Sequence, residues 1–338
     1  MRSGGEGRSA RRVRRGRAAG ARRTQRAAAR QPWKNSHVMH PEELPQDAPL
    51  SAAFLRHIVA IALDEDLGPV PGRDVTTQAT IPVTARVQGV VRARVDGVVA
   101  GLSAVAETCA QVASRLELPM PTITERVVDG SRVEAGAALV DVEGPGHVVL
   151  IAERTMLNLV SRASGIATHT RRWADALEGT QAKVLDTRKT TPGLRELEKY
   201  AVRMGGGLNK RMGLFDCAMI KDNHIVAAGS VTDAVAAIGA RFPGVPIQVE
   251  VETWEQADEA LAAGVRFLML DNLAPAQMAQ FVARVRGREP ELGKVWLEAT
   301  GGLTLANARE VAATGVDFMS VGGLTHSSPI LDVALDLF

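Results

Sequence analysis

The 338-residue chain has few cysteines and few aromatic residues. Cys109 and Cys217 are its only cysteines, and they form no CxxC motif, so the sequence predicts neither a disulfide framework nor a cysteine-based metal site. Aromatic residues make up 4% of the chain, which favours closely packed α/β layers over a surface for stacking nucleic-acid bases. No apolar run approaches the roughly 20 residues that cross a bilayer. We therefore expect no membrane association and a reducing, cytoplasmic compartment.

Positive charge is concentrated at the start of the sequence. Residues 1–31 contain eleven arginines and a single acid, Glu6, although the formal net charge of the whole chain is only +2. Without an apolar core this segment is not a secretory signal, but its composition is compatible with binding to nucleic acid or an anionic surface, or with an organelle transit peptide. Because it lacks amphipathic periodicity and interleaved aromatic residues, we expect residues 1–48 to be a basic disordered extension, with Met39 as an alternative start.

The next part of the sequence, residues 49–152, predicts a small α+β sandwich domain. A helical stripe follows Ser51, apolar and polar residues alternate over 87–96 as in a half-buried strand, and a helix is expected over 103–116. Residues 122–151 contain short apolar runs separated by turn signals at Asp129-Gly130 and at 144–146.

Short apolar runs then alternate with amphipathic helices. The predicted strands are 183–186, 217–221, 247–251, 266–270, 295–298 and 317–321. Such alternation implies parallel strands with helical crossovers, and six or seven units favour a barrel or a nearly closed barrel. We expect residues 153–325 to form an incomplete parallel α/β barrel, and residues 326–338 to pack back towards the N-terminal domain.

Polar residues follow each of these six strands. They are Asp186, Arg188 and Lys189; Lys221 and Asp222; Glu250 and Glu252; Asp271 and Asn272; Glu298 and Thr300; and Ser320, Gly322 and Gly323. Because the carboxyl ends of barrel strands converge on one face, this register predicts that all of these groups lie in one mouth.

The chemistry of this set indicates a multiply anionic substrate. Arg188 can bind a carboxylate or a phosphate through two hydrogen bonds, and Lys189 and Lys221 each supply a point positive charge. The glycine pairs at 301–302 and 322–323 let backbone N–H groups approach an anion and are predicted to bind a phosphate. Glu250 and Asp271 are candidates to hold Mg²⁺ against a pyrophosphate, the alternative being that they neutralise Lys189 and Lys221. His224 and His326 were assigned no acid-base role, because a single histidine near a strand end is usually a structural residue.

Taken together, the motifs of residues 50–338 resemble the quinolinate phosphoribosyltransferase family. They are EDLGPVPGRDVTT at 65–77, ERTMLNLVSRASGIAT at 153–168, LDTRKTTPGLR at 185–195, KYAVRMGGGLNKRMGLFD at 199–216, IKDNHI at 220–225, VEVET at 249–253, LDN at 270–272, ATGGL at 299–303 and VGGLTHS at 321–327. The resemblance implies a homodimer, with a higher oligomer as the alternative, in which each N-terminal region covers the neighbour's barrel mouth. It also implies an activity: quinolinate and phosphoribosyl pyrophosphate give nicotinate mononucleotide, pyrophosphate and CO₂, with Mg²⁺ as cofactor.

The resemblance further implies roles for individual residues. Arg154 reaches quinolinate across the dimer, and Arg188, Arg211 and Lys221 hold its carboxylates from within the barrel. Lys189 holds the pyrophosphate. The remaining roles are ribose and Mg²⁺ binding by Glu250 and Asp271, and 5′-phosphate binding by Thr300, Gly301, Gly302, Gly322, Gly323 and His326.

This chain departs from the family pattern after the glycines at 205–207. It has Asn209-Lys210-Arg211 where Asn-His-Arg is usual, so Lys210 is placed among the substrate-binding residues with an expected effect on quinolinate affinity or pH dependence. Three rival functions remain open at this point. They are a same-fold phosphoribosyltransferase with a different acceptor, a sugar-phosphate isomerase or lyase with a Schiff base on Lys221, and nucleic-acid binding through the arginine-rich tail, which we do not expect.

Overall fold

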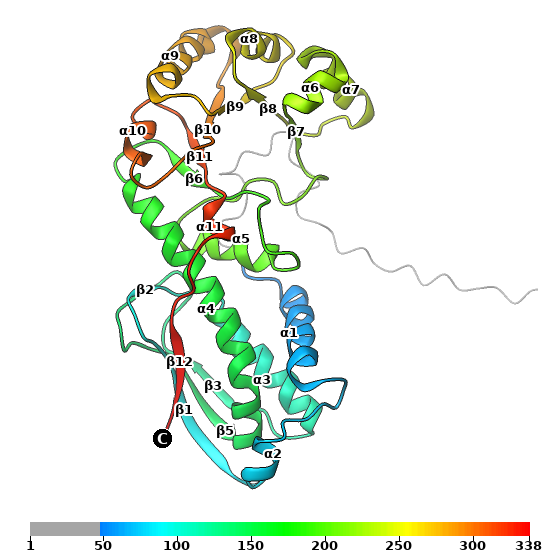
Figure 1. Cartoon of the computed structure of the whole chain (residues 1–338), viewed down its shortest axis with the longest axis vertical. Helices are drawn as coiled ribbons and strands as arrows, with labels where there is room; N and C mark the ends of the chain where they lie inside the picture. Colours follow the sequence, from blue (N-terminus) through cyan, green and yellow to red (C-terminus); the bar gives the residue numbers. More distant parts are fainter. Residues whose placement is uncertain (1–47) are drawn as a thin grey trace, which may run out of the picture. The chain divides into compact units, whose positions relative to one another are not determined.

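The computed structural model describes residues 48–338, which contain two main sheets and a helix that contacts both (Figure 1). The elements are α1 Ala52–Leu67, α2 Thr77–Thr80, β1 Arg86–Ala93, β2 Gly97–Val98, α3 Ser103–Leu116, β3 Thr122–Glu125, β4 Arg132–Val133, β5 Ala138–Pro145, α4 Gly146–Ala176, β6 Lys183–Leu185, α5 Arg195–Met204, β7 Ala218–Ile220, α6 Asp222–Ala228, α7 Val231–Arg241, β8 Ile247–Val251, α8 Trp254–Ala262, β9 Phe267–Asp271, α9 Pro275–Leu292, β10 Trp296–Thr300, α10 Ala308–Ala312, β11 Phe318–Ser320, α11 Gly323–His326 and β12 Val333–Leu337. The predicted extension, residues 1–48, lies outside the described residues except for Ala48. None of the described helices has the length and apolar character needed to span a bilayer.

The first sheet is antiparallel, with the strand order β12-β1-β5-β3. Its edge strand β12 comes from the C-terminus and pairs with β1, so that Val333 lies opposite Ala93. Along β1, Val91 and Ala93 are fully buried, but the strand ends there, and Val95 is 45% exposed. The alternation predicted over 87–96 therefore does not extend beyond residue 93, and within β1 the buried Val90 interrupts it.

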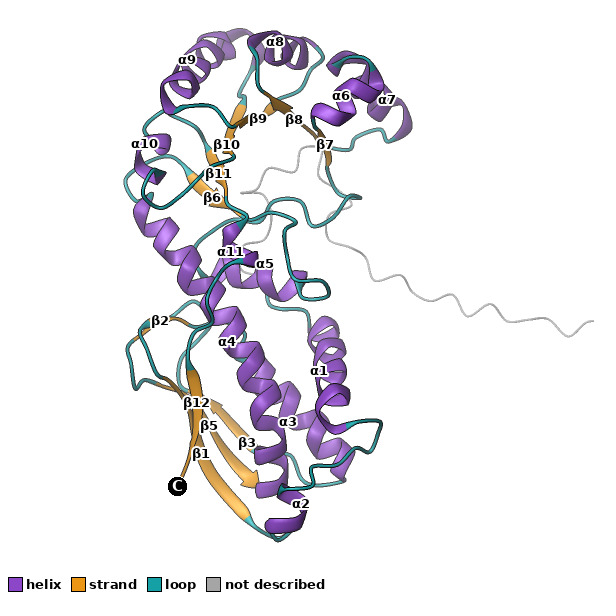
Figure 2. Cartoon of the chain, in the orientation of Figure 1, coloured by secondary structure: helices purple, strands orange, loops and turns teal. Residues whose placement is uncertain are grey.

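Helices α1, α3 and α4 pack on one another, and α4 contacts strands β1, β5 and β12 of this sheet (Figure 2). Helix α1 buries Leu55, Val59 and Leu63, a spacing of four residues that places them on one face. The hydroxyl of Ser51 accepts a hydrogen bond from the backbone N–H of Phe54 at 3.2 Å and so caps this helix at its N-terminus. Helices α3 and α4 complete the same hydrophobic core.

Helix α4 begins earlier than its sequence indicates. The signal at residues 144–146 predicts a turn, and the sequence after it predicts a helical segment that starts near Glu153. Instead β5 ends at Pro145, and α4 starts at the next residue and continues for 31 residues. Glycine and proline are common at helix starts as well as in turns, so the local pattern does not separate the two. This single helix contacts both main sheets, including β5 and β6, and the domain limits 49–152 and 153–325 stay predictions.

The second sheet is parallel, with the order β6-β11-β10-β9-β8-β7. Its six strands fall where the sequence predicts them, within one or two residues at each end. Helices follow the strands along the chain, and the strands form an arc whose edges, β6 and β7, are not paired with each other (Figure 2). Leu185, Phe267, Met269 and Phe318 pack together as a small apolar cluster of residues from three of its strands, β6, β9 and β11. The predicted incomplete parallel α/β barrel is confirmed.

An irregular segment, residues 205–217, connects α5 to β7. Leu208 extends the sheet beyond β6 by one parallel bridge to Leu185. The backbone then leaves the strand conformation, and residues 209–211 belong to no regular element. This segment carries Lys210 and Arg211.

Because proline is favoured in the first turn of a helix, Thr191-Pro192 predicts a helix start, but helix α5 begins at Arg195. Residues 191–194 form a turn closed by a hydrogen bond from Leu194 N–H to Thr191 O. Gly193 lies in this turn at φ 82°, a left-handed conformation that glycine adopts readily and that interrupts a helix. The loop between β6 and α5 is consequently longer than the sequence indicates.

Candidate active site

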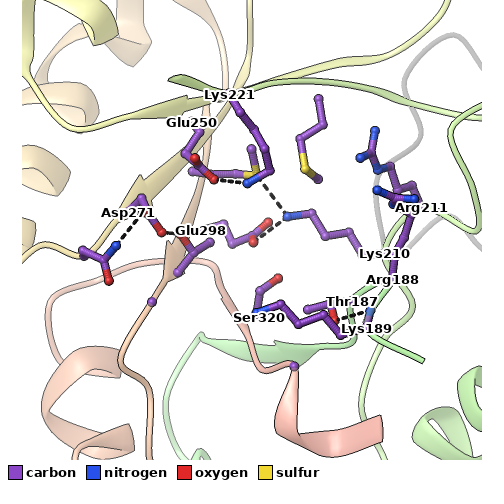
Figure 3. Close-up of a pocket in the computed structure, with 16 residues that line it drawn as sticks. Thr187, Arg188, Lys189, Lys210, Arg211, Lys221, Glu250, Asp271, Glu298 and Ser320 are labelled. Carbon is purple, nitrogen blue, oxygen red and sulfur yellow. Dashed lines mark hydrogen bonds and ion pairs between the residues drawn. The ribbon is translucent and has the colours of Figure 1, made fainter. Parts of the chain in front are cut away.

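A cavity of about 480 Å³ opens at the carboxyl ends of the parallel strands (Figure 3). All six strands of the parallel sheet, or the loops that follow them, contribute residues to the cavity wall. The 205–217 segment contributes the rest. The lining residues are Thr187, Arg188, Lys189, Lys210, Arg211, Met219, Lys221, Glu250, Met269, Asp271, Asn272, Glu298, Thr300, Gly301, Ser320 and Gly322.

The lining is rich in charge. It includes five cations, from residues 188, 189, 210, 211 and 221, and three carboxylates, from residues 250, 271 and 298, which gives a formal charge of +2. Figure 3 shows two groups of side chains that face each other across the cavity. One group is the cations Arg188, Lys189, Lys210 and Arg211, and the other is the carboxylates of β8, β9 and β10, which are Glu250, Asp271 and Glu298. A cavity of this composition attracts anions while it keeps oxygen acceptors for hydroxyl groups or a hard cation.

Two of the five cations are already paired. Lys221 forms an ion pair with Glu250, and the Nζ atom of Lys210 lies 2.6 Å from Oε1 of Glu298. The Lys210–Glu298 pair is almost completely buried, with side-chain exposures of 6% and 0%. Asp271 has no cation partner in the described structure, and instead it accepts a hydrogen bond from the Thr300 hydroxyl at 2.5 Å.

The other three cations, Arg188, Lys189 and Arg211, form no ion pair with any carboxylate of residues 48–338. Arg211 donates from Nη1 to the carbonyl of Cys217 at 2.9 Å, and its Nε atom is buried without a partner. Burial and the neighbouring Arg188 lower the pKa of the Arg211 guanidinium. These groups have hydrogen-bonding capacity that a bound anion can satisfy.

The loop that carries Arg188 and Lys189 is held from both sides. The hydroxyl of Thr325 donates to the carbonyl of Lys189 at 2.8 Å, and Arg195 on α5 donates to the carbonyl of Arg188 at 3.3 Å. Elements far apart in the sequence therefore fix the backbone of these two residues.

The glycine loops border this cavity and a second one. Gly301 and Gly322 line both, whereas Gly302, Gly323 and His326 line only the second, which has a volume of about 520 Å³ and shares Lys189 with the first. Gly301 has φ 81°, and a Cβ atom there would lie 2.1 Å from Oδ1 of Asn272. Only glycine fits at this position.

Four residues that the sequence places in the mouth or at the substrate line neither cavity. Asp186 is fully buried and paired with Lys199 on α5, because its side chain turns to the interior side of the β6 end. Asp222 and Glu252 are exposed, since each lies at or beyond the point where its strand has ended. Arg154 is exposed on α4 and lines neither cavity within one chain; its predicted role across a dimer stays a prediction.

Glu298 and Ser320 line the cavity although neither was included in the predicted binding set. Both were recognised as strand-end residues, and both carry a buried oxygen without a hydrogen-bond partner in the described structure, Oε2 of Glu298 and Oγ of Ser320. The sequence predicts that both lie at strand ends, but it does not identify Lys210, the partner that Glu298 meets in the cavity. Thr187, Met219 and Met269 were missed, whereas Asn272, which the register places in the mouth, does line the cavity.

His224, in the first turn of α6, makes a hydrogen bond with the residue that precedes this helix. Its Nδ1 atom accepts a hydrogen bond from the backbone N–H of Lys221 at 3.0 Å, at the start of α6. Among residues 48–338, no group of three or more histidine, cysteine or acidic side chains is arranged to hold a metal ion.

An incomplete parallel barrel with cations and carboxylates at its strand ends defines an α/β-barrel enzyme that acts on multiply anionic small molecules. Family models sharpen this class: residues 74–164 match "Quinolinate phosphoribosyl transferase, N-terminal domain" and residues 166–336 match the C-terminal domain of the same family. The chain belongs to the quinolinate phosphoribosyltransferase family.

Individual proteins agree with this assignment. The chain is 48% identical over 282 residues to the nicotinate-nucleotide pyrophosphorylase [carboxylating] of Mycobacterium leprae (strain TN), covering 83% of this chain and 96% of that protein. It also matches the solved structure of NadC from Streptococcus pyogenes with a TM-score of 0.79 and 34% identity, over 86% of this chain and 99% of that one. The nicotinate-nucleotide pyrophosphorylase structure from Francisella tularensis matches with a TM-score of 0.77 and 32% identity, over 88% and 99%.

Proposed function

We propose that this chain transfers the phosphoribosyl group of phosphoribosyl pyrophosphate to quinolinate and releases CO₂, forming nicotinate mononucleotide for NAD biosynthesis. The observation that carries this function is the set of three unpaired cations, Arg188, Lys189 and Arg211, in one cavity with Glu250 and Asp271. Quinolinate is a dicarboxylate and its co-substrate carries a phosphate and a pyrophosphate, so the site must neutralise several negative charges at once.

Each substrate group has a matching part of the site. Arg188 and Arg211, with Lys221, are suited to the two carboxylates of quinolinate, because guanidinium groups bind carboxylates in a bidentate manner. Lys189 lies in both cavities and is suited to the pyrophosphate. The glycine loops that border the second cavity are suited to the 5′-phosphate.

The reaction needs positioning and charge more than proton transfer. The bond from the ribose C1 atom to pyrophosphate breaks and leaves positive charge on the ribose, which the pyridine nitrogen of quinolinate then attacks. The bond from ring C2 to its carboxylate breaks next, and the electron pair stays on C2 beside the positive ring nitrogen until C2 takes up a proton. Cations that hold the departing pyrophosphate and orient the pyridine supply most of the catalysis.

We further propose Mg²⁺ as the cofactor. Glu250 and Asp271 provide carboxylate oxygens, which this ion prefers, and two carboxylates with substrate phosphates and water make up its usual ligands. The absence of a larger acidic cluster in residues 48–338 fits an ion that arrives with the pyrophosphate. When bound, Mg²⁺ would neutralise charge on the departing pyrophosphate.

The proposed assembly is a homodimer with shared sites. Arg154 is exposed on α4 and absent from both cavities of its own chain, so a second chain is needed if it is to meet quinolinate. Within the 205–217 segment two large apolar side chains are exposed, Leu214 at 71% and Phe215 at 61%. The proposed compartment is the cytoplasm, where the two free, buried cysteines would stay reduced.

The Schiff-base rival is disfavoured by the ion pair between Lys221 and Glu250. A lysine that attacks a carbonyl must be neutral, and a carboxylate beside it stabilises the charged form.

The direct test is to incubate the purified protein with quinolinate, phosphoribosyl pyrophosphate and Mg²⁺ and to measure nicotinate mononucleotide. Nicotinate replaces quinolinate in a parallel reaction. Product from quinolinate alone, lost in Arg188→Met and kept in the matched surface variant Arg288→Met, supports the function. Product from nicotinate, or from neither acceptor, contradicts it.

A further inference from the structure

A buried ion pair lies directly behind the cavity wall. Asp186 at the end of β6 and Lys199 on α5 are 0% and 1% exposed, and they are joined by an ion pair that does not itself line the cavity. The cost of removing two charges from water is large, and well-packed apolar side chains often stabilise a protein as well. Stability alone is therefore a weak explanation for this pair.

The pair binds the backbone of Lys210 on both sides. Oδ1 of Asp186 accepts a hydrogen bond from Lys210 N–H at 2.8 Å, and Nζ of Lys199 donates to Lys210 O at 3.2 Å. The side chain of Asn209 completes the network, because its Nδ2 atom donates to Asp186 Oδ2 at 2.7 Å and to Lys199 O at 2.9 Å.

These contacts explain an unusual property of the cavity wall. Lys210 and Arg211 are adjacent in sequence, yet both line the same cavity, which an extended strand does not permit because successive side chains point to opposite faces. The backbone between them must leave the strand conformation, as it does at residues 209–211. Since this segment is buried, its polar backbone groups need partners, and Asp186 and Lys199 supply them for Lys210.

We propose that Asp186 and Lys199 are positioning residues, which hold the backbone of Lys210 so that the side chains of Lys210 and Arg211 both face quinolinate. The inference rests on the proposed function. Asp186 and Lys199 do not touch the substrate; they act through the two cations that they place. Their loss should therefore weaken quinolinate binding selectively and leave the binding of phosphoribosyl pyrophosphate, which uses the other side of the cavity, unchanged.

The test is the variant Asp186→Asn/Lys199→Met, which removes both charges and keeps the side-chain shapes. We expect a folded protein whose KM for quinolinate rises by roughly tenfold to a hundredfold, since displacing a binding group by about 1 Å costs up to about a hundredfold. The KM for phosphoribosyl pyrophosphate should stay within about twofold of wild type, because Thr325 and Arg195 hold the backbone of Lys189 and Arg188 independently of the buried pair. Asn209→Ala removes one part of the network and should change the quinolinate KM in the same direction by less.

The matched control is Asp317→Asn. Asp317 is also buried, and it also accepts hydrogen bonds from a backbone N–H, that of Leu297 at 2.8 Å, and from a cation, Arg286 at 2.7 Å. It precedes β11, at the opposite end of the strands from the cavity. This variant should lose thermal stability without a change in either KM.

The outcomes separate the two proposals. A selective rise in the quinolinate KM supports the positioning role. Unchanged kinetics, or equal rises in both KM values, overturn it while the wild-type activity stands. A wild-type protein that forms no nicotinate mononucleotide overturns the proposed function and this role with it. If the double variant does not fold, the two KM values are measured for Asn209→Ala instead. A selective rise in its quinolinate KM supports the positioning role, and unchanged or equally raised KM values overturn it.

Discussion

The buried pair of Lys210 and Glu298 gives the sharpest quantitative prediction. Replacing Lys210 by Met leaves Glu298, which is 0% exposed, with neither of its carboxylate oxygens partnered, because Oε2 already lacks a partner. Removing one member of a buried pair costs about 3–5 kcal/mol. At about 2–3 °C per kcal/mol for a chain of this size, Tm should fall by roughly 6–15 °C.

Activity should fall with stability. Losing a hydrogen bond to a charged group costs about 1.5–3 kcal/mol, or roughly tenfold to a hundredfold in the quinolinate KM, and the uncompensated carboxylate adds repulsion of a dianionic substrate. Replacing Glu298 by Gln in the same protein removes that charge. Lys210→Met/Glu298→Gln should therefore regain most of the lost Tm and part of the lost affinity.

The assay is thermal unfolding together with the quinolinate KM for wild type, both single variants and the double variant. Such a cycle isolates the energy of coupling between the two residues. If the double variant is as unstable and as inactive as Lys210→Met, the reasoning is wrong, because the loss then comes from the lysine alone and not from the carboxylate that it leaves behind.

Three further predictions concern other parts of the chain. Gly301→Ala should raise the KM for phosphoribosyl pyrophosphate, because a Cβ atom there meets the Asn272 side chain at 2.1 Å and the backbone has φ 81°; steady-state kinetics at saturating quinolinate checks this, and an unchanged KM would contradict it. Burial raises the pKa of the Cys109 and Cys217 thiols to about 12, so iodoacetamide at pH 8 should label neither in the native protein and both after unfolding, as read by mass spectrometry. Burial also lowers the pKa of His169 below its usual value, so this residue stabilises the fold above about pH 6.5 and that contribution is lost as pH falls; His169→Gln should show a smaller fall in Tm between pH 7 and pH 5 than wild type, and an equal fall would refute the assignment.

The sequence by itself determined the parallel sheet and most of the site. Each of the six strands is a short apolar run with a helix after it, and this pattern depends on neighbours within one or two turns of chain. Glu250 and Asp271 fall at strand ends in the same register, so their meeting in one cavity follows from parallel pairing alone. The pattern that predicts the helix at 103–116 is equally local. At residues 144–146 the local pattern does not decide the structure, because glycine and proline fit a turn and a helix start alike.

Only the tertiary structure decided which strand-end groups face the substrate. Asp186 and Glu298 look alike in sequence, each an acid at the end of a buried strand. The side chain of Asp186 points into the protein interior and away from the cavity. It does so because Lys199, on helix α5, and the backbone N–H of Lys210 donate hydrogen bonds to it there. Glu298 lines the cavity because Lys210 reaches it from a segment 88 residues away in the chain. A buried charge takes the direction in which it finds a partner, and a partner brought near by folding cannot be identified from local pattern.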